Sequence, residues 1–243
     1  MITKIHGIVL SVVRHNERNN IVTLYTAERG RMACLSSAAA GKSGRLRNAR
    51  LQPLALIESN INFRENRDLQ FLGAVTAPAP WRDLYFNPAK APIVIFISEF
   101  LRKILQNSEQ DRNIWNYILS AIATLDKAAG GIANYHISFL IGLLHFIGIA
   151  PDVSDYSEGD LFNMRTSEFT PRHPGHGDVL SPEETALIPL LIKMNFRNMA
   201  HFRFNVVQRR RLLRILLNYY AIHLSVSPEM KSLDILSELF GTP

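Results

Sequence analysis

The sequence predicts an α+β protein in which a small N-terminal β-barrel precedes an all-α helical domain. Short stretches rich in β-branched residues fill about the first 80 residues, with no long helix between them. Apolar residues recur with a helical period from about residue 88 onward. The segment Ala77-Pro78-Ala79-Pro80 separates the two patterns as a stiff boundary. We therefore expect one domain over residues 1–80 and a second over residues 81–243.

The N-terminal domain contains five stretches with strand composition. They are Ile5–Val13, Ile21–Thr26, Arg31–Leu35, Leu54–Glu58 and Leu69–Val75. The links at 16–20 and 28–30 have lengths that suit antiparallel hairpins. Five short strands in this arrangement predict a small barrel or sandwich, and an OB-type barrel is the commonest such form that binds oligonucleotides.

The second domain is expected to be a helical bundle with a polar insert. Helical periodicity covers Pro88–Leu105, Asn113–Ala128, Ile132–Gly148, Asn205–Leu224 and Leu233–Phe240. Ser181-Pro182-Glu183-Glu184 has the pattern of a helix start and predicts a helix to about Met194. The insert covers residues 151–180 and contains two strand-like pieces, Leu161–Met164 and Glu168–Thr170.

Composition narrows the class of protein. Hydrophobic residues make up 47% of the chain and charged residues 20%, a balance typical of a globular protein with a real core. Cys34 is the only cysteine, which excludes an internal disulfide and a thiolate zinc site. The N-terminus does not have the pattern of a signal peptide, and the longest apolar run, Ile137–Ala150, is too short to span a membrane. We expect a soluble cytoplasmic protein.

The net charge of +6 belongs to the N-terminal domain. Residues 1–80 hold eleven basic and five acidic residues, whereas the remainder holds sixteen of each sign. A local excess of this kind attracts polyanions, although a merely solubilising surface is the alternative. The residues expected to contact DNA are Arg14, Arg29, Arg31, Lys42, Arg45, Arg47, Arg50 and Arg64.

The segment Ser36–Arg50 carries half of these cations. It combines small residues and two glycines with basic side chains, which predicts a flexible loop that contacts phosphates without reading bases. Aromatic residues for stacking are few. Tyr25 and Phe71 lie in strand patterns typical of core residues, and Phe63, beside Arg64, is the better candidate.

A second basic cluster lies on the predicted helix Asn205–Leu224. Its members are Arg209, Arg210, Arg211 and Arg214. The apolar positions of this helix form a buried stripe, so the arginines should face outward or flank it. A solvated face is the default interpretation, and a patch that binds DNA or an acidic protein tail is the alternative.

Several of these segments together resemble the RecO family of bacterial recombination mediators. The resemblance rests on an opening GIVL strand (Gly7–Leu10), IVTLYTAERGR (Ile21–Arg31), RLQP (Arg50–Pro53), LLHFIGIAP (Leu143–Pro151), and the terminal YYAIHL (Tyr219–Leu224) and KSLDIL (Lys231–Leu236). It implies an N-terminal OB-fold and a C-terminal helical domain.

The resemblance also implies a function. Members of the family bind single- and double-stranded DNA and anneal complementary strands. They assist recombinase loading together with RecR, in the RecF pathway, and some contact the acidic tail of single-strand-binding protein. By this resemblance the chain is a cytoplasmic, nucleoid-associated mediator of DNA repair and recombination whose barrel holds DNA and whose helical half contacts proteins.

One feature departs from the family pattern. Many relatives have a four-cysteine zinc element after the segment that matches Gly148–Pro151, and this chain has no cysteine there. Asp152, Asp155, His173 and His176 keep a paired-ligand spacing, but a loop that folds without metal is the simpler interpretation. We therefore expect no metal and no cofactor.

Enzyme motifs are missing from the sequence. Nucleophile-elbow, zinc-protease, phosphate-loop and dinucleotide patterns are all absent. His136, His145 and His223 lie in helical apolar patterns typical of core histidines. A non-enzymatic DNA-binding mediator is the leading hypothesis. The alternatives are a metal-dependent nucleic-acid hydrolase that uses the Asp152 to His176 set, and an adaptor that only bridges proteins.

Overall fold

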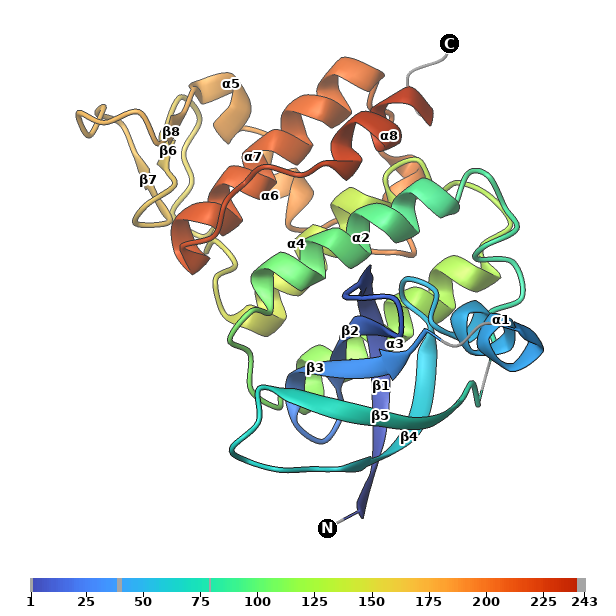
Figure 1. Cartoon of the computed structure of the whole chain (residues 1–243). Coiled ribbons are helices and arrows are strands. Elements are labelled where there is room, and N and C mark those ends of the chain that lie inside the picture. The colour runs from blue at the N-terminus through green and yellow to red at the C-terminus, as the bar shows by residue number, and fades with distance from the viewer. Residues whose placement is uncertain (1, 39–40, 79, 240–243) are drawn as a thin grey trace. The chain divides into compact units, whose positions relative to one another are not determined.

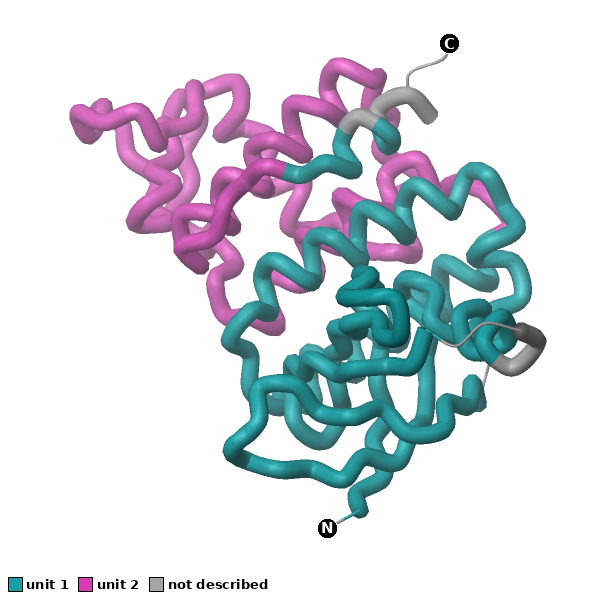
Figure 2. The backbone as a smooth tube through the Cα atoms, in the orientation of Figure 1, with its two compact units in different colours: residues 1–128, 230–239 teal, residues 129–229, 240–243 magenta. Residues whose placement is uncertain are grey.

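The structure is a computed structural model that describes residues 2–38, 41–78 and 80–239. The chain divides into two compact units (Figure 2). Unit 1 comprises residues 1–128 and 230–239, and unit 2 contains residues 129–229. We expected two domains that meet at residue 80. That domain boundary is a different division from the one between these two units, and it stays a prediction.

Unit 1 is built on a closed barrel (Figure 1). Its strands are β1 (Ile2–Arg14), β2 (Asn19–Thr26), β3 (Gly30–Ser37), β4 (Leu56–Asn62) and β5 (Leu69–Thr76). They follow the order β1-β2-β3-β5-β4, β1 pairs with β4 to close the barrel, and β3 runs parallel to β5. This OB-like barrel followed by helices confirms the predicted α+β fold class.

The fourth strand begins later than the sequence pattern indicated. We expected Leu54–Glu58, whereas β4 covers Leu56–Asn62. Leu54 has a φ of 61°, in the left-handed region, so its backbone turns instead of extending. Leu54 is nevertheless fully buried, which explains why its apolar side chain fitted a strand pattern.

Helices cover the outer faces of β1 and β2. Helix α2 (Ala91–Ile104) lies against β1, where the Ser98 hydroxyl donates to the Leu10 carbonyl oxygen over 2.6 Å. In α3 (Arg112–Lys127), the Trp115 ring lies 6.2 Å from the Tyr25 ring. These outward-facing strand residues are therefore buried, and the barrel interior holds a separate apolar core. Helix α8 (Ser232–Leu239) packs against α2.

A helix occupies the segment that we expected to be a flexible loop. Helix α1 covers Gly41–Arg50 and connects β3 to β4. Beyond Gly44 its residues are mostly good helix formers, and Arg47 and Arg50 in the last turn complement the helix dipole. Composition alone, with two glycines and small neighbours, concealed this helix.

Gly30 allows a close contact at the turn between β2 and β3. Its φ is +67°, and a Cβ atom there would lie 2.4 Å from the Ser108 carbonyl oxygen. The next residue, Arg31, donates its backbone N–H to the same oxygen over 3.0 Å. Glycine is required here both for the backbone conformation and for the space.

Unit 2 is mainly helical (Figure 1). Its helices are α4 (Tyr135–Ile147), α5 (Pro182–Thr185), α6 (Ile188–Leu191), a 3₁₀ turn at Met199–His201, and α7 (Val206–Leu224). The single helix expected from Ser181 to Met194 is instead the pair α5 and α6. Pro189 lacks an N–H and clashes with the carbonyl four residues earlier, which breaks the helix.

The insert forms a small sheet in the order β7-β6-β8. Strands β6 (Leu161–Asn163) and β7 (Glu168–Thr170) confirm the two predicted strand-like pieces, and β8 (Val179–Leu180) joins them. Phe169 packs against Tyr156 and Phe162, with ring centroids 5.3 and 5.1 Å apart, and Phe162 reaches Tyr219 of α7. An aromatic cluster holds this insert together.

Candidate nucleic-acid interface

The arginines predicted to contact DNA fall into two groups at opposite ends of the barrel. The first group is Arg29, Arg31 and Arg64, at the β2–β3 turn and the β4–β5 loop. The second is Arg14, at the end of β1, with Arg45, Arg47 and Arg50 on α1. The parallel strands β3 and β5 run from one group to the other, and an eight-residue strand spans about 26 Å at about 3.3 Å per residue.

Hydrogen bonds and a ring contact hold two members of the first group, Arg64 and Arg29, in place. The buried amide side chain of Gln70 accepts the Arg64 backbone N–H over 3.0 Å and donates to the Arg64 carbonyl oxygen over 2.9 Å. The Arg29 guanidinium carbon lies 3.6 Å from the centre of the Phe63 ring. Phe63 also packs against the barrel core, so Arg29 covers part of the ring that we considered for stacking.

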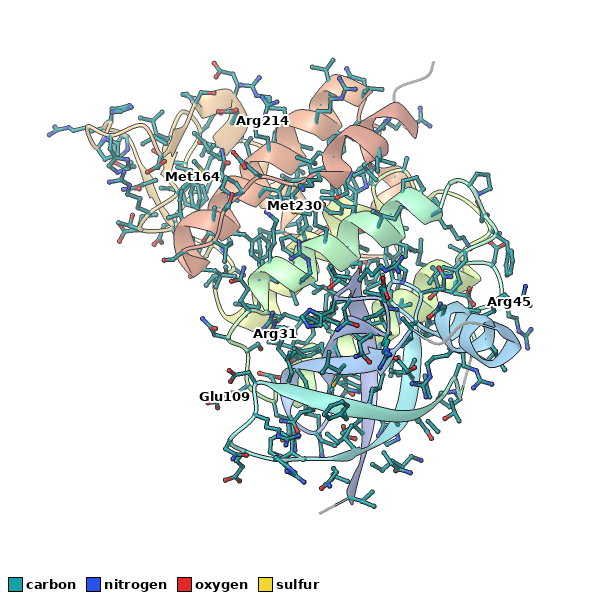
Figure 3. The ribbon with its side chains drawn as sticks, in the orientation of Figure 1. Arg31, Arg45, Glu109, Met164, Arg214 and Met230 are labelled. Atoms are coloured by element: carbon teal, nitrogen blue, oxygen red, sulfur yellow. The ribbon has the colours of Figure 1, made fainter. Side chains whose placement is uncertain are left out.

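The second group combines anchoring and exposed arginines. Arg50 donates to the Val75 carbonyl oxygen over 2.6 Å, and Arg47 donates to the Gly73 carbonyl oxygen over 3.2 Å. Both bonds fasten α1 to the end of β5. Arg45 is exposed on the same helix (Figure 3), as is Arg14 on β1. The side chain of Lys42 lies outside the described part of the structure.

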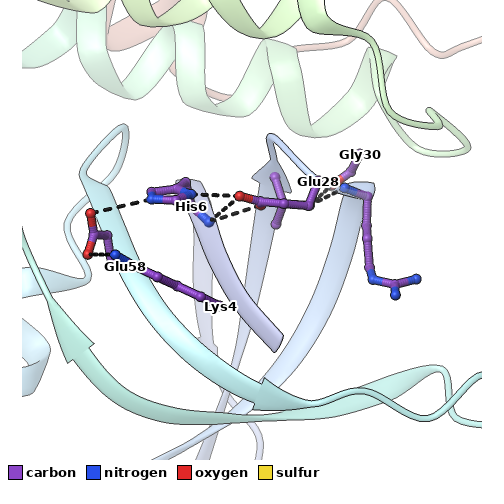
Figure 4. Close-up of polar contacts among 7 residues, drawn as sticks. Lys4, His6, Glu28, Gly30 and Glu58 are labelled. Carbon is purple, nitrogen blue, oxygen red and sulfur yellow. Dashed lines mark hydrogen bonds and ion pairs between the residues drawn. The ribbon is translucent and has the colours of Figure 1, made fainter. Parts of the chain in front are cut away.

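Two acidic residues of the barrel are bound by other side chains of the barrel itself (Figure 4). Lys4 Nζ lies 2.7 Å from Glu58 Oε2, and His6 Nδ1 lies 2.6 Å from Glu28 Oε1. The hydrogen bond from Lys4 lowers the pKa of Glu58, which keeps it ionised. In contrast, across the described residues none of the seven arginines in the two groups forms an ion pair with an acid.

An apolar row crosses the outer face of the barrel between the two arginine groups. Strand register places Val13 beside Ile21, Ile21 beside Leu35, and Leu35 beside Phe71. Phe71 is 59% exposed, so its expected place in the core is wrong, whereas Tyr25 is fully buried as expected. Both face outward; α3 covers Tyr25, and Phe71 stays open to solvent. An exposed aromatic ring among cations is the arrangement that stacks nucleic-acid bases.

The arginines of α7 differ in their surroundings. Arg210, Arg211 and Arg214 are exposed, as expected, and Arg211 Nε lies 2.8 Å from Glu184 Oε1. Arg209 is half-buried and donates to the Phe204 carbonyl oxygen. Its burial lowers the pKa of its guanidinium. The four residues therefore do not act as one uniform patch.

The structure does not assemble the residues of the hydrolase alternative. Among the described residues no group of three His, Cys, Asp or Glu side chains could hold a metal ion. His173 and His176 instead accept backbone N–H groups two residues ahead, from Gly175 and Asp178. The paired spacing in the sequence reflects two local turns.

The three histidines expected in the core have separate environments. His136 is buried, and the His223 ring contacts the Met164 carbonyl oxygen over 2.8 Å. His145 is exposed at the end of α4, so its expected burial is wrong. The helical period placed it near an apolar stripe, but the last turn of the helix runs into solvent.

Sequence reasoning missed an ionic cluster that forms around buried Lys90 and holds residues 82–84. Lys90 is fully buried; its Nζ lies 2.7 Å from Asp83 Oδ2 and donates to the Asp126 carbonyl oxygen over 2.8 Å. The Asp126 carboxylate accepts the backbone N–H groups of residues 82–84. Burial opposes its ionisation, but these hydrogen bonds outweigh that effect and lower its pKa. Only the aromatic spacing of Trp81, Tyr85 and Phe86 hinted at an ordered segment.

Comparison with known proteins identifies the family. Residues 1–79 match the family model for the recombination protein O N terminal, and residues 87–233 match that for the recombination protein O C terminal. The chain belongs to the RecO family. It is 35% identical to the DNA repair protein RecO of Phocaeicola vulgatus over 241 residues, which cover 99% of this chain and all of that protein.

Further RecO proteins match over nearly the same length. The DNA repair protein RecO of Porphyromonas gingivalis is 32% identical over 246 residues, and that of Flavobacterium psychrophilum is 30% identical over 239 residues. These matches cover 99% and 98% of this chain and 100% and 99% of the two relatives. The family resemblance seen in the sequence is confirmed.

Over the residues that the structure describes, we find no helix with the length and apolarity needed to cross a bilayer.

Proposed function

We propose that this RecO-family chain is a non-enzymatic mediator of DNA repair and recombination. It binds single- and double-stranded DNA on unit 1, anneals complementary strands, and assists recombinase loading together with RecR. The observation that carries this proposal is the set of arginines at both ends of β3 and β5 that have no acidic partner among the described residues, while Glu28 and Glu58 are bound by His6 and Lys4. Arginines without acidic partners can neutralise phosphates and release counterions.

The same residues define the path that we propose for a DNA strand over unit 1. Phosphates contact Arg29, Arg31 and Arg64 at one end and Arg14, Lys42 and Arg45 at the other. Bases pass over the apolar row, where exposed Phe71 offers a stacking surface. Arg47 and Arg50 contribute mainly by positioning α1, because their guanidinium groups hydrogen-bond to β5. Contacts of this kind position a strand without reading its sequence, as annealing of any complementary pair requires.

Protein contacts are assigned to unit 2 as part of the same proposal. Val207 is 74% exposed and lies one turn from Arg210 and Arg211 on α7. Exposed arginines beside an apolar side chain suit an acidic protein tail, such as that of single-strand-binding protein. The domain division at residue 80 and a place in the cytoplasm near the nucleoid belong to this proposal too.

An annealing assay tests the function directly. Complementary labelled strands are mixed with the protein, with and without Mg²⁺ or Mn²⁺. We expect faster duplex formation with strands of unchanged length in both conditions. Metal-dependent shortening of the strands that Asp155→Ala abolishes would contradict the proposal and support the hydrolase. The absence of any DNA binding would support the protein adaptor.

A further inference from the structure

An aromatic groove lies at the C-terminal end of α1, apart from the apolar row. It has a volume of about 230 Å³. Its lining residues are Ala49, Arg50, Ala55, Leu56, Ala77, Pro80, Trp81, Tyr85 and Phe86. All of them belong to unit 1. Trp81, Tyr85 and Phe86 form the aromatic wall of the groove, and this wall lies between the two segments that match the family models.

The polar ends of the lining side chains are tied to the backbone of the protein. Trp81 Nε1 donates to the Leu54 carbonyl oxygen over 3.0 Å, and the Tyr85 hydroxyl donates to the Pro53 carbonyl oxygen over 3.0 Å. Arg50 donates to the Val75 carbonyl oxygen. These bonds fix the orientation of the rings before any ligand arrives, which reduces the entropy lost on binding.

The wall is also anchored from behind. Asp126 holds the backbone of residues 82–84, and buried Lys90 pairs with Asp83. The acids next to the groove are thus engaged with the protein itself. Phe86 is 82% exposed at the mouth, a large apolar surface for a residue in a fixed segment.

The charge and the volume of the groove together indicate which kind of ligand it binds. Among the residues that the structure describes, the lining holds one cation and no acid, and the sequence of Gly41–Arg50 on α1 has Arg45 and Arg47 but no acid. The volume is below the range of pockets for drug-sized ligands and suits one planar heterocycle. Rigid aromatic faces beside a guanidinium stack a base of any identity.

We propose that this groove binds a nucleobase of single-stranded DNA while exposed Arg45 of α1 holds a flanking phosphate. The inference rests on the proposed function and deepens it, because it gives the protein a preference for single strands. In a duplex each base is stacked and paired, so it reaches such a groove only after extrusion from the helix.

The test compares Phe86→Ala with Phe146→Ala, an exposed phenylalanine on α4 of unit 2. Affinity is measured for a 20-nucleotide oligo-dT and for a duplex of equal length. We expect Phe86→Ala to weaken oligo-dT binding about five- to tenfold, with the duplex affinity and the salt slope unchanged. Phe146→Ala should leave both affinities unchanged.

A second measurement follows the fluorescence of Trp81 and leaves Phe86 unchanged. Trp81 and Trp115 are the only tryptophans, so Trp115→Phe leaves Trp81 as the sole indole probe. We expect oligo-dT to quench its emission and duplex DNA to leave it nearly unchanged.

The outcomes separate the two proposals. If the wild-type protein binds both DNAs while Phe86→Ala and the Trp81 emission show no effect, the groove assignment is overturned and the proposed function stands. Quenching by an acidic peptide but not by oligo-dT would also overturn the assignment, in favour of a protein partner. If the wild-type protein binds neither DNA, both proposals fail.

Discussion

Helices α1 and α7 both carry runs of arginines, yet the molecule uses the two runs differently. On α1, Arg47 and Arg50 hold β5 carbonyl oxygens, and among the described residues no arginine of this helix pairs with an acid. On α7, Arg209 bonds to the Phe204 carbonyl oxygen and Arg211 pairs with an acid. The same residue type at similar density therefore gives one helix with uncompensated charge and another in which part of the charge is already used. The partners of a charge, more than its abundance, decide whether a surface attracts a polyanion.

The largest expected difference between the helices is in stability. Leu212 of α7 is 2% exposed, whereas Leu46 of α1 is 54% exposed. Leu212→Ala should lower the free energy of unfolding by about 2–5 kcal/mol through lost burial and a residual cavity. Leu46→Ala should change it by less than about 0.5 kcal/mol. Urea denaturation followed by circular dichroism measures both, and equal effects would mean that α1 is packed as tightly as α7.

The second difference is in the response to acid. It arises beside α7, because His136 of α4 is buried and feels the charge of Arg209 on α7. Burial, together with the charge of Arg209, lowers the pKa of His136 to about 3. Because this folded-state pKa lies below the unfolded value of about 6.5, the neutral form is favoured in the fold. Stability is then complete above about pH 6.5 and is lost as the pH falls toward 3, with about 2 kcal/mol gone by pH 5.

Nuclear magnetic resonance checks this prediction without unfolding the protein. The imidazole signals of His136 should stay those of the neutral ring from pH 8 to pH 5. Titration of His136 near pH 6.5 would contradict the account of Arg209 and of the buried ring.

A smaller effect separates two arginines on α1 itself. Arg50→Ala removes a hydrogen bond from a charged donor to Val75 and should lower the free energy of unfolding by about 1 kcal/mol. Arg45→Ala, its exposed neighbour, should lower it by less than about 0.5 kcal/mol. Thermal unfolding of the two variants side by side provides the measurement, and a reversed order would show that Arg50 does not anchor the helix.

The sequence predicted the fold class and most elements because strand and helix periods are local signals. It failed where distant segments decide the outcome. Tyr25 and Phe71 both lie on outward strand positions, and only the placement of α3, far along the chain, buries the first and leaves the second open. Helix α1 was missed for a related reason, since its attachment depends on β5 carbonyl oxygens that follow it in sequence.

The candidate site was predicted as a set of charges but not as a geometry. Composition identified the basic residues of the barrel, while their division between two ends follows from strand register alone. The aromatic groove was not predicted, because its floor and wall come from residues 49–56 and 77–86 and meet only in the folded unit. Buried Lys90 gave no local signal either, since its partner Asp83 lies in the non-helical segment before α2 begins at Ala91.

The central claim is that the uncompensated arginines of unit 1 bind phosphates. The salt dependence of duplex DNA affinity tests it, with Arg14→Ala, Arg45→Ala and Arg64→Ala combined in one variant. The logarithmic slope should fall by about 2–3, at about 0.7–0.9 for each lost phosphate contact. The matched variant Arg210→Ala, Arg211→Ala, Arg214→Ala on α7 should keep the wild-type slope. An unchanged slope in the first variant, or an equal loss in the second, would contradict the account.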